Sequence, residues 1–131
     1  MKIKVNIVTP DGPVSETEAD MVIAVTETGE LGVLPGHIAM VAPLDIGALR
    51  LKNGNKTEHV AVNGGFLEIR PDVVTVLAQS AELASNIDVA RAELARRKAE
   101  VELQQKKDKV EQHMAELSLR RAINRIKVSG M

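Results

Sequence analysis

The stretch PDVVTVLAQSAELASNIDVARAELARRKAE, residues 71–100, joins two different sequence patterns. Its first part follows the turn signal Pro71-Asp72 and is rich in valine, which is typical of a short strand. Its second part consists mostly of Ala, Glu, Leu, Lys and Arg, which favour helix, and no Gly or Pro occurs in residues 86–128. The change of pattern predicts two domains: a β domain in residues 1–85 and a helical domain in residues 86–131.

The chain before this stretch has the pattern of a small all-β domain. Ile3, Val5 and Ile7 alternate with polar residues, as expected for a strand with one buried face. Turn signals separate further short strands, which are predicted at residues 21–26, 38–41, 46–52, 58–62, 66–70 and 73–78. Asn53-Gly54 predicts a type I′ hairpin turn, because both residues tolerate positive φ. Short strands at this spacing indicate a β-sandwich or barrel, so the expected fold class is α+β.

The helical domain carries two narrow stripes of small apolar residues at helical spacing. They consist of Ala92, Ala95, Ala99 and Leu103, and of Ala115, Leu119, Ala122 and Ile126. Two such helices can pack closely as an antiparallel hairpin, although neither would be very stable alone. Ser85 and Asp88 fit the start of the first helix, and Asp108 could cap a second one. Because residues 104–108 hold no Gly or Pro, one continuous helix is almost equally permitted.

Composition argues against a catalytic or metal-binding role. The 131 residues include no cysteine, which excludes disulfides, thiolate metal sites and a cysteine nucleophile. The three histidines, His37, His59 and His113, are scattered, and the sequence has neither a phosphate-binding loop nor an HExxH motif. We therefore predict that the chain is not an enzyme and has no catalytic residue and no metal site.

Charge is divided unequally between the two predicted domains. Residues 1–85 hold 6 Lys+Arg against 11 Asp+Glu, a net charge of −5, whereas residues 86–131 hold 11 against 7, a net charge of +4. The opposite signs predict different tasks. Binding of nucleic acid is disfavoured, because the whole chain has a net charge of −1 and Phe66 is its only aromatic residue. Nothing resembles a membrane span of roughly 20 apolar residues or a secretory signal, so a cytoplasmic location is expected.

The segment GELGVLPGH, residues 29–37, is apolar, rich in turn signals and bracketed by Glu30 and His37. One interpretation is a wide corner of the sandwich that buries the histidine. The other is a protein contact, because exposed apolar loops often mark such surfaces.

A basic cluster is predicted at one end of the helical hairpin. Asp88, Arg91 and Ala92 share one face of the first helix, and Arg121 and Arg125 are one turn apart in the second. If the hairpin closes antiparallel, three guanidinium groups and a carboxylate converge, which suits a polyphosphate that carries a base. Alternatively, Asp88 caps the helix and pairs with Arg91, and the other two arginines form a solvated face.

Several segments resemble the ε subunit of the F-type ATP synthase, especially the form found in bacilli. They are VTPDGPV, GELGVLPGH, VNGGFLEIRPD, IDVARA and RRAINRI, in the order found in that family, and the resemblance covers essentially the whole chain. It implies a sandwich of about ten strands at the foot of the central rotor stalk, in contact with the γ subunit and the membrane ring of c subunits. It also implies that Glu30 and His37 lie in the rotor interface. The chain would lie at the cytoplasmic face of the cell membrane, held there only through the complex.

The resemblance further implies a regulatory role for the hairpin. In this family the hairpin moves between a folded state and an extended state, which reaches the α and β subunits of the catalytic head and inhibits ATP hydrolysis. In bacillus-type members ATP is a regulatory ligand that stabilises the folded state. The matching residues are Glu82, Ile87, Asp88, Arg91, Ala92, Arg121 and Arg125. Two departures are Lys98, where relatives have an arginine with its planar fork, and Lys106-Lys107, where relatives have small polar residues.

A second interpretation is a free-standing ATP-binding sensor that joins no complex. The basic cluster of the hairpin fits both interpretations. The apolar segment at residues 29–37 favours the docked subunit, and co-purification with rotor subunits would separate the two.

Overall fold

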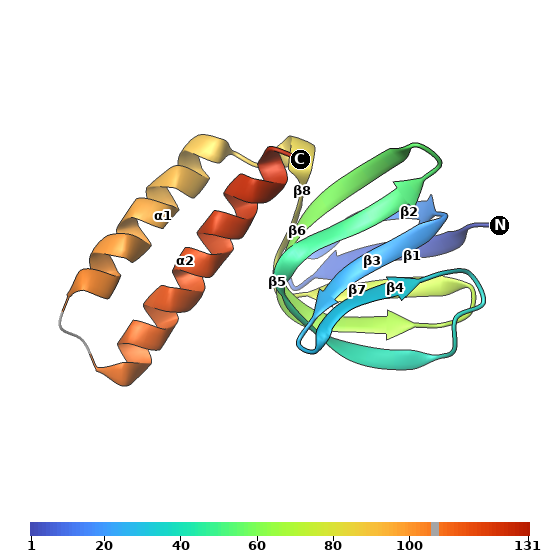
Figure 1. Ribbon diagram of the computed structural model, residues 1–131, viewed down its shortest axis with the longest axis horizontal. Coiled ribbons are helices and arrows are strands. Elements are labelled where there is room, and N and C mark those ends of the chain that lie inside the picture. Colours follow the sequence, from blue (N-terminus) through green and yellow to red (C-terminus); the bar gives the residue numbers. More distant parts are fainter. Residues whose placement is uncertain (106–107) are drawn as a thin grey trace. The chain divides into compact units, whose positions relative to one another are not determined.

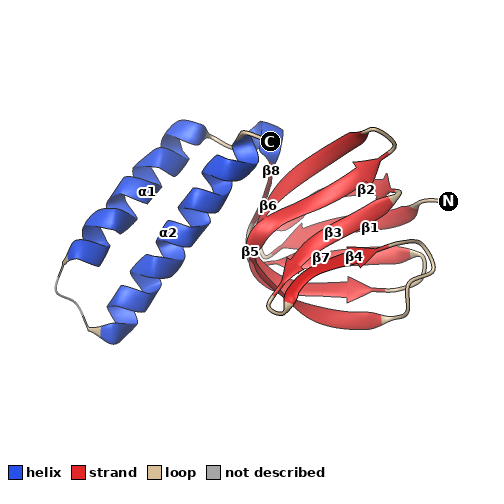
Figure 2. Ribbon diagram, in the orientation of Figure 1, coloured by secondary structure: helices blue, strands red, loops and turns tan. Residues whose placement is uncertain are grey.

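The computed structural model describes residues 1–105 and 108–131 and divides into two compact units, Met1–Leu83 and Ala84–Met131. The first unit is built of strands and the second of helices (Figures 1 and 2). The expected fold class, a β-sandwich followed by two helices, is confirmed. The predicted linker pair Lys106-Lys107 lies outside the described residues.

The strands of the first unit form one continuous sheet. Their bounds are β1 Ile3–Thr9, β2 Gly12–Ala19, β3 Met21–Thr26, β4 Gly29–Val33, β5 Met40–Asn53, β6 Lys56–Ile69, β7 Val73–Ala78 and β8 Ala81–Leu83. The 8-stranded sheet has the order β2-β1-β7-β6-β5-β3-β4, with β8 paired to β6. Neighbouring strands are antiparallel except β1 and β7, which are parallel.

Two long strands fold this sheet into the two layers of a sandwich. β5 and β6 pair with each other along nearly their whole length, but β7 pairs only with the second half of β6 and β8 only with its first half. Counting each long strand twice gives the ten strand segments that the resemblance implies. The strands predicted at residues 38–41 and 46–52 are thus parts of one strand, except that residues 38 and 39 belong to the preceding loop.

A bend inside β6 explains why its two halves were predicted as separate strands. Gly64 and Gly65 have φ values of 78° and 118°, yet both lie within β6, where they turn the strand without ending it. A Cβ atom at Gly65 would overlap the carbonyl oxygen of Leu77 on β7. Only glycine permits both this conformation and this close approach of two backbones.

The edges of the sheet and one turn also differ from the sequence prediction. β2 and β4 end the sheet on its two sides, and β2 was missed because an edge strand, paired on one side only, needs no strict alternation. Residues 29–33, predicted as part of a loop, form β4. The β5–β6 turn centres on Gly54-Asn55, and among the described residues only glycines have positive φ. The predicted type I′ turn was therefore wrong, and a type II′ turn fits.

The core of the sandwich consists of aliphatic side chains from the inner faces of both layers. Its members lie between Ile3 and Ala78, and none of the described helical residues belongs to this cluster. Ile3, Val5 and Ile7, whose burial the alternation predicted, are fully buried. The β unit therefore has a hydrophobic core of its own.

The second unit consists of a short 3-10 turn and two α-helices. They are η1 (Ala84–Asn86), α1 (Val89–Gln104) and α2 (Lys109–Ser129), and the two α-helices lie side by side in opposite directions (Figure 1). Asp88 caps α1 and Asp108 caps α2, because each carboxylate accepts a hydrogen bond from the backbone N–H three residues later. Ser85, expected at the helix start, lies in η1 instead.

The seam between the helices is built of small residues. The buried residues are Ala92 and Ala99 in α1 and Ala115, Ala122 and Val128 in α2. The predicted stripe was wrong at Ala95, which is exposed, whereas the neighbouring Arg96 is half-buried. Residue 96 therefore lies nearer than residue 95 to the face of α1 that meets α2.

Candidate functional site

The start of α1 holds several residues of the predicted nucleotide-binding set. Ile87 is buried and Asp88 is exposed. Oδ1 of Asp88 accepts a hydrogen bond from the N–H of Arg91 at 3.1 Å, which is the capping role considered from the sequence. An ionised carboxylate has about four acceptor positions on two oxygens, so capping leaves capacity for an amino group of a ligand.

The rest of the predicted set on α1 has mixed exposure. The side chains of Arg91 and Lys98 are exposed, and their spacing of seven positions, about two turns, places both on one side of the helix. Ala92 is fully buried in the unit. Ala92 therefore contributes close packing, while Arg91 and Lys98 present positive charge to solvent.

The arginines of α2 lie at the same end of the hairpin. Arg121 and Arg125 are half-buried and flank Ala122 of the seam. Because the helices are antiparallel and α2 contacts η1, the last turns of α2 lie beside the start of α1 (Figure 1). The fold thus brings both arginines to the end of the hairpin that carries Asp88. Glu82 belongs to the other unit, where it lies opposite Ala61 in the β6–β8 pairing.

Arg96 is a charged residue of the hairpin that the sequence analysis did not single out. Its Nε and Nη2 donate to Oε2 of Glu93 at 3.1 and 2.6 Å, and its Nη1 donates to Oε1 of Glu100 at 2.9 Å. The hydrogen bonds and charge of Glu93, followed by the charge of Glu100, raise the pKa of Arg96. The signal in the sequence was the spacing E-x-x-R-x-x-x-E on one helix. The guanidinium of Arg96 therefore makes these hydrogen bonds within α1 itself.

The two residues predicted for the rotor interface lie at different places. Glu30 is exposed near the start of β4, and its Oε1 accepts a hydrogen bond from Nη2 of Arg50 at 3.0 Å. His37 lies beyond the end of β4, and its Nδ1 donates to the carbonyl oxygen of Ile38 at 2.7 Å. Roughly 10 Å of strand separate Glu30 from the start of the loop that carries His37. That loop is tied to the β6–β7 turn by the hydrogen bond from the N–H of Gly36 to the carbonyl oxygen of Pro71.

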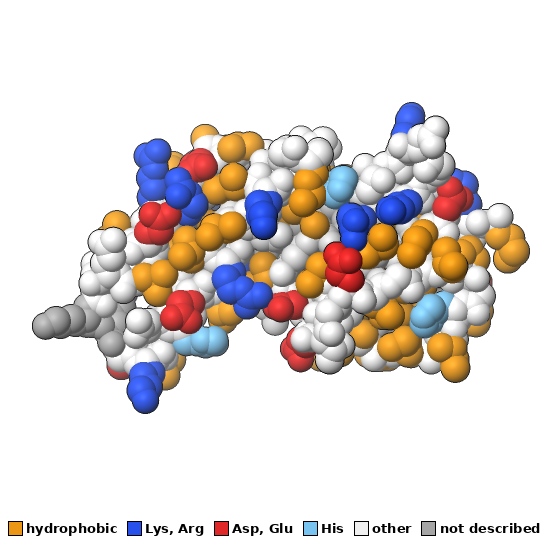
Figure 3. Space-filling model, in the orientation of Figure 1, with side chains coloured by type: hydrophobic (Ala, Val, Ile, Leu, Met, Phe, Trp, Pro, Cys, Tyr) orange, Lys and Arg blue, Asp and Glu red, His pale blue; other side chains and the backbone are white. Residues whose placement is uncertain are grey.

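The outer face of one layer carries a row of apolar residues that sequence analysis also missed. Cross-strand pairing aligns Pro13, Val8, Leu77, Phe66 and Pro43 over β2, β1, β7, β6 and β5. We call these five residues the outer row. Phe66 is 55% exposed and Leu77 is 45% exposed, and a shallow hollow beside them is lined by Val8, Thr9, Pro10, Gly65, Phe66, Leu77, Ala78 and Gln79. Figure 3 shows hydrophobic side chains gathered into patches on the visible surface.

The sequence did contain a signal for the outer row. β7 and the second half of β6 also carry apolar residues on the outer face (Val73, Leu77 and Phe66, beside the polar Thr75 and Glu68), although a strand of a two-layer sandwich needs only one apolar face. The position of Phe66, next to the fully buried Leu67, places the chain's only aromatic side chain on the outer face. What the sequence could not supply was the register that lines up five strands.

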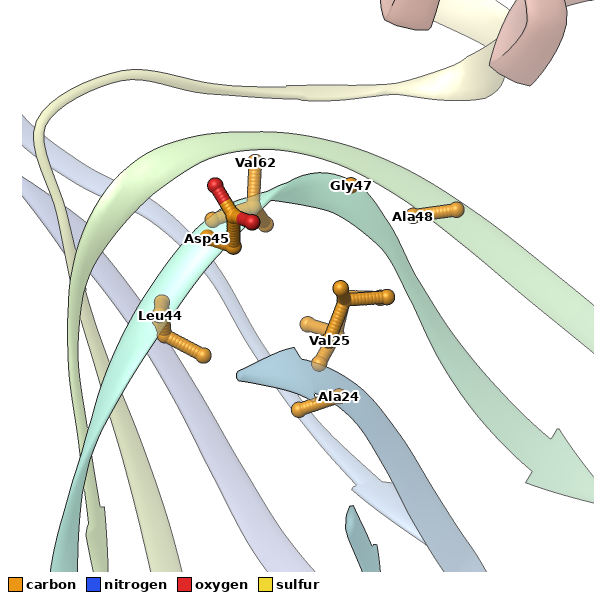
Figure 4. A pocket seen from close by; sticks show the side chains of 8 residues that line it. Ala24, Val25, Leu44, Asp45, Gly47, Ala48 and Val62 are labelled. Atoms are coloured by element: carbon orange, nitrogen blue, oxygen red, sulfur yellow. The ribbon is translucent and has the colours of Figure 1, made fainter. Parts of the chain in front are cut away.

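A small internal cavity lies at the bend of β5 (Figure 4). Its volume is about 10 Å³, and its lining residues are Ala24, Val25, Leu44, Asp45, Gly47, Ala48, Leu49 and Val62. A space of this size holds at most about one water molecule. Oδ1 of Asp45 accepts a hydrogen bond from the N–H of Ile46 at 2.8 Å, which stabilises the bend. The cavity is therefore a packing feature of the bent strand.

The described residues hold neither a metal site nor a membrane-spanning helix. Within residues 1–105 and 108–131, no group of three His, Asp or Glu side chains is arranged to hold a metal ion. Neither described α-helix is both long and apolar enough to cross a membrane.

Comparison with known proteins identifies the family. The family described as ATP synthase, Delta/Epsilon chain, beta-sandwich domain matches residues 2–84, and the long alpha-helix domain of the same chain matches residues 85–130. The chain belongs to the ATP synthase delta/epsilon chain family. The family resemblance and the prediction of a non-catalytic subunit are therefore confirmed.

Relatives in this family cover most of the chain. The ATP synthase epsilon chain of Bacillus cytotoxicus is 61% identical over 127 residues, which cover 97% of this chain and 96% of that protein. The epsilon chain of Anoxybacillus flavithermus is 67% identical over 104 residues, which cover 79% and 78%.

Solved structures support the fold. A chain of the Euglena gracilis mitochondrial ATP synthase matches with a TM-score of 0.76 at 24% identity, covering 91% of this chain and 76% of that one. A chain of the Tetrahymena thermophila mitochondrial ATP synthase central stalk matches with a TM-score of 0.67 at 13% identity, covering 98% and 97%.

Proposed function

We propose that this delta/epsilon family member is the ε subunit of an F-type ATP synthase and regulates it through a mobile hairpin. The sandwich attaches to the rotor by contacts with the γ subunit and the ring of c subunits, at the cytoplasmic face of the cell membrane. The helical hairpin moves between the closed form and an extended form that reaches the α and β subunits and inhibits ATP hydrolysis. ATP bound at the closed hairpin holds inhibition off.

The observation that carries this proposal is the small seam of the hairpin. Helices α1 and α2 bury four alanines and one valine, and no residue from them joins the core of the sandwich. Burial of alanine removes little apolar surface from water, so the closed hairpin gains little free energy from packing. Two short helices held by such a seam can separate without unfolding the sandwich.

Charge supports the same division of tasks. The hairpin segment, residues 86–131, has a net charge of +4, and residues 1–85 have a net charge of −5. A basic hairpin suits an acidic surface on a partner subunit in the extended form and an anionic ligand in the closed form. Both forms of the proposed switch therefore use the same charges.

ATP binding is proposed at the end of the hairpin that carries Asp88, Arg91, Arg121 and Arg125. Arginine forks bind phosphate oxygens in pairs, and the Asp88 carboxylate can accept from the amino group of the base. Lys98 contributes a point charge in place of a fork. Because only the closed hairpin brings the two helices together, the ligand would stabilise the closed form by mass action.

Removal of the hairpin tests the inhibitory role. We expect an ATP synthase assembled with residues 1–85 to hydrolyse ATP faster than one with the full chain, while the amount of assembled complex stays the same. The measurement is steady-state hydrolysis of the purified complex, with subunit content checked on a gel. Equal hydrolysis by the two complexes would contradict the inhibitory role.

Substitution of one arginine tests the ligand site. Arg121→Ala removes a charge-assisted hydrogen bond, which costs roughly 1.5–3 kcal/mol, so the dissociation constant for ATP should rise about 10- to 150-fold. The matched control is Arg120→Ala, the adjacent and more exposed arginine on a different face of α2. Isothermal titration of the full chains decides the matter. Equal affinities for both variants, or no binding at millimolar ATP, would show that the cluster is a solvated face.

We place the contact with the γ subunit on the outer row. A subunit that turns with the rotor needs a contact that excludes water, and a row of apolar side chains across five strands offers one about 19 Å long. Phe66→Asp should weaken co-purification of the chain with γ at least tenfold, because a central aromatic residue often dominates an interface. Thr57→Asp, an exposed change elsewhere on β6, serves as the control. If both variants still co-purify with γ, the outer row serves another contact. The alternative function, a free-standing ATP sensor, predicts instead that even the wild-type chain does not co-purify with γ.

A further inference from the structure

Glu30 and Arg50 form an ion pair on the outer face of the layer that contains β3, β4 and part of β5. Arg50 lies on β5, directly opposite Ile23 of β3, which in turn lies opposite Gly32 of β4. Glu30 stands two residues from Gly32 on β4, so its side chain is on the same outer face. The guanidinium of Arg50 therefore passes over β3 to reach Glu30, and the 3.0 Å bond connects residues 20 positions apart.

The surroundings of the pair leave this path open. Gly32 has no side chain, and a Cβ atom there would lie 2.7 Å from Cε of Met21. Met21 thus covers the glycine, and within β4 this face carries no bulky side chain other than that of Glu30 itself. Arg50 is the more covered partner, with 32% of its side chain exposed against 62% for Glu30. The covered cation is held near the strands, and the carboxylate projects further into solvent.

Stability of the fold does not account for this arrangement. Ion pairs between exposed side chains contribute little to folding, since water screens them and ordering two long side chains costs entropy. At an interface the same ordering favours binding, because a side chain that is already held loses less conformational entropy when the partner binds. One hydrogen bond from Arg50 also leaves further acceptor positions on the carboxylate.

We propose that Arg50 is a positioning residue that holds the Glu30 carboxylate for contact with a basic side chain on the rotor. This inference rests on the proposed attachment of the sandwich to the rotor, with Glu30 in that interface as the family resemblance implies, and it adds the internal partner of Glu30. Arg50 does not touch the rotor itself. It fixes the rotamer of Glu30 before the subunit docks.

The test compares four full-length variants in binding to a rotor subcomplex of γ and the c ring that lacks this chain. Glu30→Gln should weaken binding most, and Arg50→Gln should weaken it about two- to tenfold, the effect of ordering one long side chain. Arg50→Lys should recover part of the affinity. The exchanged pair, Glu30→Arg with Arg50→Glu, should melt at the wild-type temperature but bind worse than Arg50→Gln, because the charge offered to the rotor is reversed.

The outcomes distinguish the rotor contact of Glu30 from the positioning role of Arg50. Wild-type binding by Glu30→Gln would refute the rotor contact of Glu30. Weaker binding by Glu30→Gln together with wild-type binding by Arg50→Gln would leave that contact standing and overturn the positioning role. Recovery of wild-type affinity by the exchanged pair would show that the ion pair matters only as a structural link, which also overturns the positioning role.

Discussion

The sandwich and the hairpin are folded by very different amounts of buried apolar surface. The sandwich encloses isoleucine, leucine and valine side chains from six strands, many of them fully buried. The helices of the hairpin bury four alanines and one valine. Of their larger apolar side chains, Leu94, Val101 and Met114 are exposed, and others such as Leu103, Leu119 and Ile126 are only half-buried. One part of the chain is therefore a stable scaffold, and the other is a marginal structure whose state can be shifted by a ligand or a partner.

The largest expected effect is the loss of one core side chain from the sandwich. Leu67→Ala removes a fully buried residue of β6 and should lower the free energy of unfolding by about 2–5 kcal/mol. The matched control is Phe66→Ala, the adjacent and exposed residue, which should cost about 0.5 kcal/mol. Urea unfolding followed by hydrogen exchange at the amides of β1 to β7 measures both. Equal losses for the two variants would mean that the core is not on the inner face assigned here.

A smaller effect is expected from crowding the seam of the hairpin. Ala99→Leu enlarges a buried residue of α1 and should destabilise the closed form by about 1–3 kcal/mol, whereas Ala95→Leu, on the exposed side of the same helix, should change it by less than about 0.5 kcal/mol. Because the chain has no cysteine, one introduced pair of spin labels on α1 and α2 can report the distance between the helices. A closed hairpin in Ala99→Leu, with unaltered sandwich amides, would contradict the tight alanine seam.

Sequence patterns predicted the parts of the fold whose residues carry their own signal. Alternation located β1, and valine-rich runs located β3 and β7. Helix formers located the helical segment but did not decide between two helices and one continuous helix. The edge strand β2 and the continuity of β6 could not be predicted in this way. Edge strands are specified by a single neighbour, and a glycine pair that bends a strand looks the same in sequence as one that ends it.

The candidate sites also differ in whether local sequence patterns or strand pairing determines them. Convergence of Arg121, Arg125 and Asp88 could be expected, because an antiparallel hairpin dictates which helix ends meet. The bond between Glu30 and Arg50 and the alignment of the outer row depend on the register of several strands, which one sequence does not state. Helical spacing could have found the Arg96 network, since all three of its members lie within two turns.

The two helix caps offer a finer test of the hairpin. Asp88 and Asp108 accept equivalent hydrogen bonds, at 3.1 and 2.8 Å, so replacing either by alanine should destabilise its helix by a similar amount, about 0.5–2 kcal/mol. Only Asp88→Ala should also weaken ATP binding beyond this loss. Asp88→Ser keeps a capping oxygen and removes the charge, so helix content by circular dichroism should recover while ATP affinity by titration stays low. Full recovery of ATP affinity in Asp88→Ser would show that Asp88 only caps α1 and does not bind ATP through its charge.

The smallest expected effect comes from a polar cluster of Asp20, Lys2 and Gly54 on the sandwich. Surface charge adds little to the stability of a unit with a large hydrophobic core. Asp20 accepts a hydrogen bond from the N–H of Gly54 at 2.7 Å and pairs with Lys2 at 3.6 Å. The hydrogen bond from Gly54, assisted by Lys2, lowers the pKa of Asp20 below its ordinary value of 3.8. Since the folded pKa lies below the unfolded one, the stabilisation is complete above about pH 4 and is lost as the pH falls through the folded pKa. Asp20→Asn should therefore melt slightly below the wild type at pH 7, and the two melting temperatures should converge under acid. A difference that stays constant down to pH 2 would mean that the charge of Asp20 plays no part in the stability of the sandwich.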